Sequence, residues 1–241
     1  MSLLELLVAT ALTAFLVLGL VHFVTAASST TLLQRNQGQI QDRARFAINR
    51  IAAAIREAGY RPEPWDETWA LEGFTADTLD AVSGGSDRLS VRTWSDRNCF
   101  DNRNPATEAD GNALFYIRET SFDLNASKGL TRQCPYGPSL AEMTTQIRRQ
   151  GLIEGVESFQ LLFAVDANAD GLAEEWVNAG AWDDPGQIRG VKVGLLLVCE
   201  MMVVIRQPTE VAVLDPRTRV KADGRLRHVF QFTAAVRSAK S

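Results

Sequence analysis

The sequence predicts an α+β fold in which one long N-terminal helix packs on an antiparallel β-sheet. Residues 1–58 contain no proline and only two glycines, Gly19 and Gly38, so one uninterrupted helix is expected. From residue 61 onward, short stretches of alternating apolar and polar residues are separated by Gly, Pro, Asn and Asp, which is typical of strands. A sheet must bury one face, and the second half of the helix is the expected cover. We therefore divide the chain into residues 1–27, 28–59 and 60–241.

Residues 1–27 predict a membrane-spanning helix, because about 20 consecutive apolar residues suffice to cross a bilayer. Residues 3–27 contain no Lys or Arg and a single carboxylate, Glu5. A lone acid in such a span costs on the order of 2–4 kcal/mol of insertion free energy, so it indicates a function. A buried carboxylate needs a cation, and nothing basic lies nearby in the same helix, so we expect its partner in another chain. The alternative is that Glu5 lies near one end of the span and reaches the interface.

Residues 28–59 predict an amphipathic half of the same helix. Apolar residues recur three and four positions apart, at Leu33, Ile40, Ala44, Ala47, Ile51, Ile55 and Ala58. This stripe favours docking on a sheet. A coiled-coil stalk would need sustained heptads with charged flanks, whereas this stripe is short and rich in alanine. Gly59 is a natural stop and Pro62 prevents the helix from resuming.

Residues 60–241 predict a β-rich head. The strands are expected at residues 69–74, 87–94, 113–118, 129–132, 156–165, 175–177, 191–205 and 225–236. Residues 95–112 predict a loop, and residues 135–138, with two prolines and a glycine, predict a turn. Single helical turns are expected within residues 139–149 and 187–189.

Composition and motifs argue against nucleic-acid binding and against catalysis. The net charge is −4, and Lys and Arg are dispersed along the chain without a basic cluster in the sequence. The sequence has no P-loop, no G-x-S-x-G, no H-E-x-x-H and no dinucleotide-binding fingerprint. We therefore expect a protein that is not an enzyme.

The three cysteines predict one disulfide and one free thiol. Cys99 and Cys134 lie in the loop-rich region, where an oxidising compartment would allow a bond between them. The closed loop of about 35 residues would stabilise the fold by roughly 3–4 kcal/mol in the chain-entropy model. Cys199 lies in an apolar strand-like run, so we expect a buried free thiol that acts as a small hydrophobic side chain.

The stretch after the strand at residues 156–165 resembles part of a calcium loop, with acidic or amide residues and a glycine in the positions that calcium loops use. The candidate ligands are Asp166, Asn168, Asp170, Leu172 (through its carbonyl) and Glu174. The last ligand position holds Val177 instead of a bidentate Glu, so the loop is not an EF-hand and the expected affinity is weak. Asp183 or Asp184 could complete the shell if the chain folds back. The alternative is a polar hairpin loop whose Asp-Gly is the turn signal.

The first residues carry a resemblance to a known family. The run Met1-Ser2-Leu3-Leu4-Glu5-Leu6-Leu7-Val8 resembles the mature N-terminus of type IV pilins. That resemblance implies cleavage by prepilin peptidase, methylation of the new N-terminus and a Glu in the fifth position. By this resemblance Met1 is the first residue of the processed chain. It also implies that Glu5 forms a salt bridge with the N-terminal amine of a neighbouring subunit during assembly.

Later segments are similar to PilW-like minor pilins. The similarity lies in residues 44–48 (ARFAI) and 55–60 (IREAGY), and in strand segments at residues 155–159, 189–195 and 227–237. It implies a type IV pilin-like fold and a minor pilin that waits in the inner membrane with its head in the periplasm, then joins a pilus at the cell surface. The implied role is priming or capping of the pilus. The implied partners are the major pilin, other minor pilins and a PilY-like tip adhesin.

Two alternatives stay open from the sequence. A J-type minor pseudopilin of a type II secretion system shares the N-terminus and the plan of helix and sheet. A membrane-tethered extracytoplasmic binding module that never polymerises would use the same anchor for a different purpose.

Overall fold

The computed structural model describes residues 2–81, 85–105, 111–202, 209–214, 217–220 and 223–237. The chain forms two compact units, residues 1–42 and residues 43–241. Helix α1 (Leu3–Glu57) belongs to both, and it is continuous as the absence of proline predicts.

The first unit is helical and its side chains from residue 2 to residue 28 are exposed. Its large apolar side chains, from Leu3 to Val24, are each more than half exposed. By length and composition this helix can cross a membrane. An apolar surface of this size has to be covered by lipid or by other helices.

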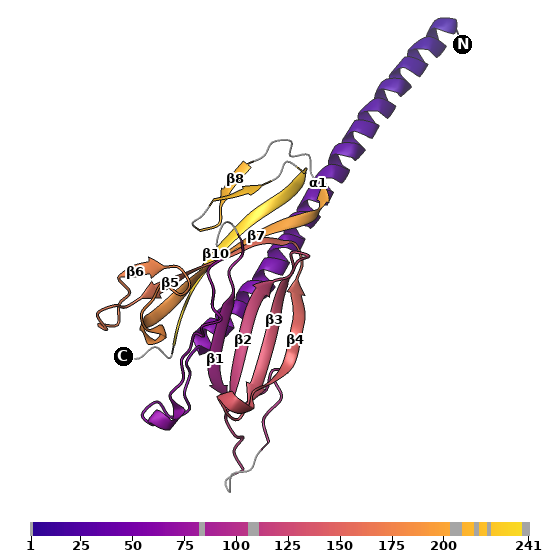
Figure 1. Ribbon diagram of the computed structural model, residues 1–241. Coiled ribbons are helices and arrows are strands. Elements are labelled where there is room, and N and C mark those ends of the chain that lie inside the picture. Colours follow the sequence, from indigo (N-terminus) through magenta and orange to yellow (C-terminus); the bar gives the residue numbers. More distant parts are fainter. Residues whose placement is uncertain are drawn as a thin grey trace. The chain divides into compact units, whose positions relative to one another are not determined.

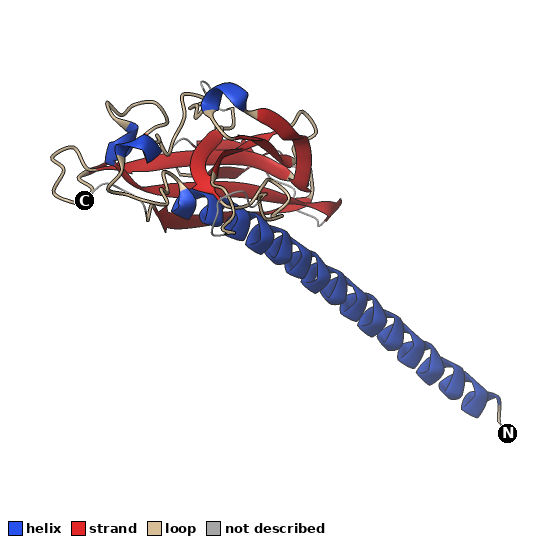
Figure 2. Ribbon diagram, turned by 90° about the horizontal axis from the view of Figure 1, so that it is seen from below, coloured by secondary structure: helices blue, strands red, loops and turns tan. Residues whose placement is uncertain are grey.

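The second unit contains two four-stranded antiparallel sheets and a small hairpin (Figures 1 and 2). The first sheet is a meander in the order β1-β2-β3-β4, and the second has the order β10-β7-β5-β6. The strands of the first sheet are β1 (Leu89–Ser95), β2 (Tyr116–Leu124), β3 (Leu130–Gly137) and β4 (Thr144–Ile153). Those of the second are β5 (Val156–Val165), β6 (Glu175–Val177), β7 (Ile188–Met202) and β10 (Arg225–Ala235). The hairpin is β8 (Thr209–Ala212) with β9 (Arg217–Val220), and the 3₁₀ turns are η1 (Glu67–Trp69), η2 (Leu140–Glu142) and η3 (Pro185–Gln187).

The last turns of α1 supply one wall of the core of this unit. The predicted stripe is almost completely buried at Ala44, Ala47, Ile51, Ile55 and Ala58. The three alanines in the stripe let the helix backbone approach the strands closely. Figure 2 shows the strands gathered on one side of this end of the helix. The docking of the helix on sheet, rather than in a coiled coil, is confirmed for this part of the stripe.

The helix ends where two glycines meet. Gly59 adopts a left-handed conformation with φ of 70°, and its N–H donates to the carbonyl of Arg92 at 2.8 Å. The returning chain passes so close that a Cβ on Gly73 would lie 2.8 Å from the Gly59 nitrogen. Gly59 therefore ends the helix as predicted, with a positive φ that favours glycine, whereas Gly73 excludes a side chain because a Cβ would clash with the Gly59 backbone.

Two predictions for the first sheet are wrong in detail. Residues 69–74 form no strand: Asp66 caps η1, and Trp69 packs edge-on against Trp94 with ring centres 4.8 Å apart. Within this segment Phe74 makes an isolated bridge to Val91. Strand β2 begins three residues later than predicted and continues to Leu124.

The predicted turn at residues 135–138 is also wrong, because β3 continues through Gly137. The ladder between β3 and β4 shifts register between Cys134 and Pro135, and an irregular ladder accommodates a residue without an N–H. Strand β4 escaped prediction, since most of its side chains are exposed and no apolar alternation marks it. In the second sheet, β5 has the predicted bounds, β6 matches residues 175–177, and β7 begins at Ile188. The last three residues of the predicted strand, 203–205, lie outside the described residues.

A buried carboxylate connects the two sheets. Asp87, which precedes β1, is 2% exposed, and its N–H donates to the Phe159 carbonyl of β5 at 2.8 Å. Its Oδ1 accepts from the N–H of Ala81 at 3.0 Å and its Oδ2 from the N–H of Leu161 at 2.7 Å. Burial raises the pKa of Asp87 to about 6, against these two hydrogen bonds, and the neighbouring Asp80 raises it further. The Asp87 carboxyl group that links the sheets is therefore protonated in mildly acidic solution.

This raised pKa predicts how stability depends on pH. Unfolded aspartate titrates near pH 4, so between pH 4 and pH 6 the folded chain holds a proton on Asp87 that the unfolded chain has lost. The contribution of Asp87 to the free energy of unfolding should therefore fall by up to about 3 kcal/mol as the pH rises through this window. Asp80→Asn removes the like charge and lowers the pKa of Asp87. The variant should therefore lose less stability as the pH rises. Urea unfolding of both proteins in detergent between pH 4 and pH 7 measures it, and an equally steep fall in the variant would contradict the coupling.

Candidate functional site

The carboxylate of Glu5 is held at the start of α1 by Ser2. The N–H of Ser2 donates to Oε2 of Glu5 at 2.8 Å, and the N–H of Glu5 donates to Oγ of Ser2 at 3.3 Å. These reciprocal bonds are a capping box, in which a serine and a glutamate three residues later satisfy the first free amides of a helix. The spacing S-x-x-E in the sequence is the signal for it, and our sequence reasoning missed it. Met1, the other residue assigned to assembly, lies outside the described residues.

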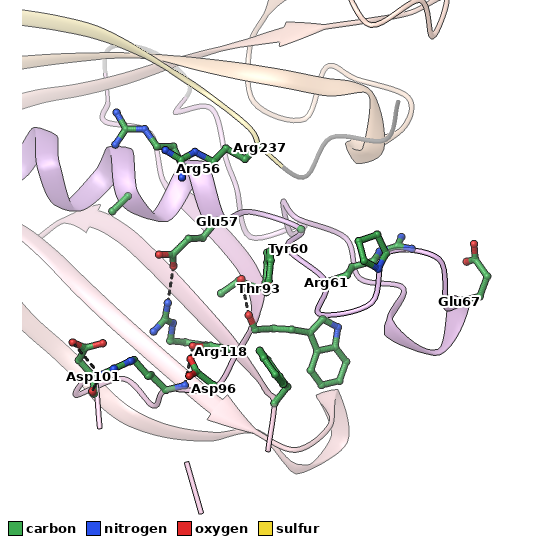
Figure 3. Close-up of a pocket in the computed structure, with 17 residues that line it drawn as sticks. Arg56, Glu57, Tyr60, Arg61, Glu67, Thr93, Asp96, Asp101, Arg118 and Arg237 are labelled. Carbon is green, nitrogen blue, oxygen red and sulfur yellow. Dashed lines mark hydrogen bonds and ion pairs between the residues drawn. The ribbon is translucent and has the colours of Figure 1, made fainter. Parts of the chain in front are cut away.

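The second unit has a groove where α1 ends, with a volume of about 1270 Å³ (Figure 3). Its walls come from the end of α1, the segment after it, the ends of β1 and β2, and Arg237. Glu57 and Arg118 form an ion pair at 2.7 Å across it, and the backbone N–H of Trp94 donates to the Tyr60 carbonyl at 3.2 Å. The lining combines arginines (Arg56, Arg61, Arg97, Arg118, Arg237) with carboxylates and the aromatic rings of Tyr60, Trp94 and Phe115. Its described lining contains neither histidine nor cysteine, and side chains of this kind suit recognition of a polar surface.

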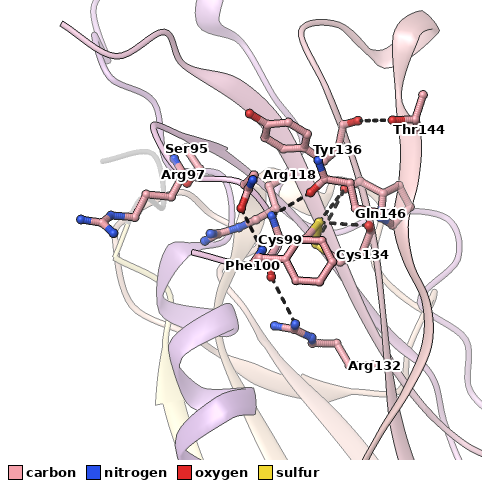
Figure 4. Close-up of a disulfide and its surroundings, with 12 residues drawn as sticks. Ser95, Arg97, Cys99, Phe100, Arg118, Arg132, Cys134, Tyr136, Thr144 and Gln146 are labelled. Atoms are coloured by element: carbon pink, nitrogen blue, oxygen red, sulfur yellow. Dashed lines mark hydrogen bonds between the residues drawn. A yellow bond between two sulfur atoms is a disulfide. The ribbon is translucent and has the colours of Figure 1, made fainter. Parts of the chain in front are cut away.

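The predicted disulfide between Cys99 and Cys134 is present, and it ties the loop after β1 to β3 (Figure 4). The N–H of Cys99 donates to Oε1 of Gln146 at 3.1 Å, and Arg132 donates to the Cys99 carbonyl at 3.2 Å. The tied loop carries Phe100, whose side chain is 61% exposed. Cys199 is a buried free thiol, as predicted.

The candidate calcium loop brings three of its predicted ligands together. Three carboxylate oxygens, one from each of Asp166, Asp170 and Glu174, lie within 4.8 Å of one another. Asn168 contacts the same group, since its Nδ2 donates to Oδ2 of Asp170 at 3.2 Å. Leu172 donates its N–H to Oδ1 of Asp170 at 2.8 Å. Among the described residues Asp183 and Asp184 are not part of this acidic group, and Asp184 instead caps η3.

Asp166, the buried carboxylate of this group, already pairs with the guanidinium of Arg189. The sequence did not reveal this contact. Asp166 is completely buried, and Nε and one terminal nitrogen of Arg189 each lie 2.7 Å from its Oδ2. Its oxygens also accept from the N–H groups of Asp170 at 3.1 Å and Gly171 at 2.9 Å. Burial alone would raise the pKa of Asp166, but Arg189 and these amides hold it below its ordinary value. Asp166 therefore has few lone pairs left, and the exposed oxygens of Asp170 and Glu174 are the better ligands.

Calcium binding stays a prediction, and the geometry sharpens its test. Asp170→Ala with Glu174→Ala removes the exposed ligands and leaves the buried pair of Asp166 with Arg189 intact. We expect wild-type affinity of roughly 10⁻⁴–10⁻³ M. Calcium at ten times its dissociation constant should stabilise the fold by about 1.4 kcal/mol, which raises Tm by about 3 °C. Calorimetric titration and thermal melts check this, and equal melting temperatures with and without 10 mM calcium would leave only a polar turn.

Comparisons with known proteins agree with this architecture. A family model described as type IV pilus-assembly protein W, PilW, matches residues 115–238, just over half of the chain. Among solved structures, a type IV-like pilin from Thermus thermophilus is similar with a TM-score of 0.52 and 14% sequence identity, over 84% of this chain and 97% of that one. At this identity the likeness shows a type IV pilin-like fold and no more. The curated proteins contain no match. Because the family model spans half of the sequence, the chain belongs to the PilW family of type IV pilus-assembly proteins.

Proposed function

We propose that this chain is a minor pilin that helps to prime or cap the assembly of a type IV pilus. The observation that carries the proposal is the position of Glu5. It is the one formally charged side chain in an exposed apolar span from residue 3 to residue 27, on a helix that continues into a pilin-like head. A carboxylate that enters an apolar filament core needs a cation from another chain.

The proposal gives each part of the chain a task. The first helix holds the subunit in the inner membrane with its head in the periplasm, after processing by prepilin peptidase. During assembly the same apolar surface leaves the lipid and packs against the helices of other subunits. Its partners there are the major pilin, other minor pilins and a PilY-like tip adhesin.

Deletion of the gene for this chain in a piliated strain tests the proposal. We expect surface pili to be lost, while the major pilin accumulates in the inner membrane and protein secretion stays normal. Restoration of the full chain should restore the pili. Normal piliation with defective secretion would instead identify a pseudopilin of type II secretion. Normal piliation with normal secretion would favour a tethered binding module.

A further inference from the structure

The fold gathers three arginines that are far apart in the sequence. Arg50 lies on α1, two turns before Glu57 and on the same helical face. Glu57 pairs with Arg118 of β2 at 2.7 Å. The register of β2 and β3 pairs Phe122 with Arg132, which puts Arg132 and Arg118 on the same face of the first sheet.

These arginines lie in the seam between α1 and the disulfide-tied loop. Figure 4 shows Phe100, Arg118 and Arg132 around the bond between Cys99 and Cys134, beside the helix. Two exposed aromatic rings border the same place. Phe46 is 43% exposed with the Arg50 guanidinium 5.7 Å from its ring centre, and Phe100 is 61% exposed on the loop. We call Phe46, Arg50, Phe100, Arg118 and Arg132 the arginine seam.

The seam holds more positive charge than its neighbours neutralise. Within the described residues, the ion pair that these three arginines make is that of Arg118 with Glu57. Burial lowers the pKa of Arg132, and the charges of Arg50 and Arg118 lower it further. The Nε–H of Arg132 is buried and meets no acceptor in the part of the chain that the structure describes. The whole chain has a net charge of −4, so this excess of positive charge is confined to the seam.

We infer that the arginine seam is a docking surface for an acidic segment of another pilin head, one that also presents an apolar side chain. Arginine and aromatic residues together are the composition of interface hot spots, and the surplus charge calls for carboxylates. Arginine accepts a carboxylate through two parallel hydrogen bonds, which gives the contact a defined orientation. The inference rests on the proposed function, because it assumes a neighbouring pilus subunit.

Photo-crosslinking in cells that assemble the pilus tests the seam. The full chain carries Phe100→p-benzoylphenylalanine, alone or with Arg50→Glu. Arg45→Glu is the matched control, since Arg45 is exposed on the same helix but about 140° away from Arg50 around its axis. We expect a crosslink to a peptide of another pilin head that contains Asp or Glu. Arg50→Glu should lower its yield about tenfold, which corresponds to about 1.4 kcal/mol of binding free energy, whereas Arg45→Glu should not.

Other outcomes overturn the inference. An equal crosslink yield in the Arg50→Glu and Arg45→Glu chains would do so, as would a captured peptide without carboxylates or a crosslink to a second copy of this chain. Counting the pili in the same strains distinguishes failure of the inference about the seam from failure of the proposed function. If the deletion strain lacks pili but Arg50→Glu cells keep both pili and crosslink, only the seam is wrong. If the deletion strain has normal pili, the proposed function itself is wrong.

Discussion

Glu5→Gln is expected to abolish incorporation of the chain into the pilus complex while the head stays folded. Glutamine keeps the size of the side chain and can serve in a capping box, but it has no charge to pair with an amine from another chain. The second unit, residues 43–241, does not contain this residue, so its stability should not change. The measurement is the amount of the chain in sheared pili at matched total protein, together with the number of pili per cell.

Ser2→Ala separates the charge from the capping geometry. It removes the hydroxyl that accepts from the Glu5 N–H and keeps the carboxylate. Loss of a helix cap costs about 1 kcal/mol, so this variant should still assemble. If Ser2→Ala fails and Glu5→Gln assembles, Glu5 acts as a cap and the proposal for an intermolecular salt bridge is wrong.

Arg227→Ala is expected to lower the free energy of unfolding by about 3–4 kcal/mol. The side chain of Arg227 is 6% exposed, and its guanidinium reaches from β10 across β7 to Glu157 of β5, with contacts of 2.6 and 3.0 Å. It also binds both oxygens of Asp223 at 2.7 Å. The hydrogen bonds that Arg227 donates to Asp223 and Glu157 raise its pKa above the ordinary value. Removal of the guanidinium leaves a poorly solvated Glu157, and that accounts for most of the loss.

Arg225→Ala is the matched control on the same strand. Arg225 is about half exposed and lies 4.0 Å from Asp223, so its loss should change stability by less than about 1 kcal/mol. Chemical unfolding of both variants in detergent gives the comparison. Equal losses would mean that the ion pairs of Arg227 add nothing beyond a surface ion pair.

The sequence predicts the parts of the fold whose patterns are local. Helix α1 follows from a long stretch without proline, and β5 follows from apolar residues between turn signals. Strand β4 does not follow, because its side chains are mostly exposed and its position depends on pairing with β3. The extension of β3 through Pro135 depends equally on its partner strand, since an irregular ladder decides whether a residue without an N–H is tolerated there.

The candidate sites divide in the same way. The pairing of Cys99 with Cys134 and the acidic group around Asp170 follow from residue type and position. The contact of Arg189 with Asp166 does not, because it depends on how β5 pairs with β7. The gathering of Arg50, Arg118 and Arg132 depends on the face of a helix and the register of two strands at once. Dispersed arginines in a sequence therefore do not exclude a basic surface in the fold.

The disulfide also has a mechanical consequence. It closes a ring of chain that contains the whole of β2, with a sequence separation of 35 residues between the linked cysteines. A tensile load that enters through the helix and leaves through the C-terminal strands passes from Cys99 to Cys134 through the sulfur atoms and bypasses β2. Under such a load the oxidised chain keeps roughly 120 Å of contour length in reserve that a reduced chain would release. The bond thereby limits how far this head can extend under tension.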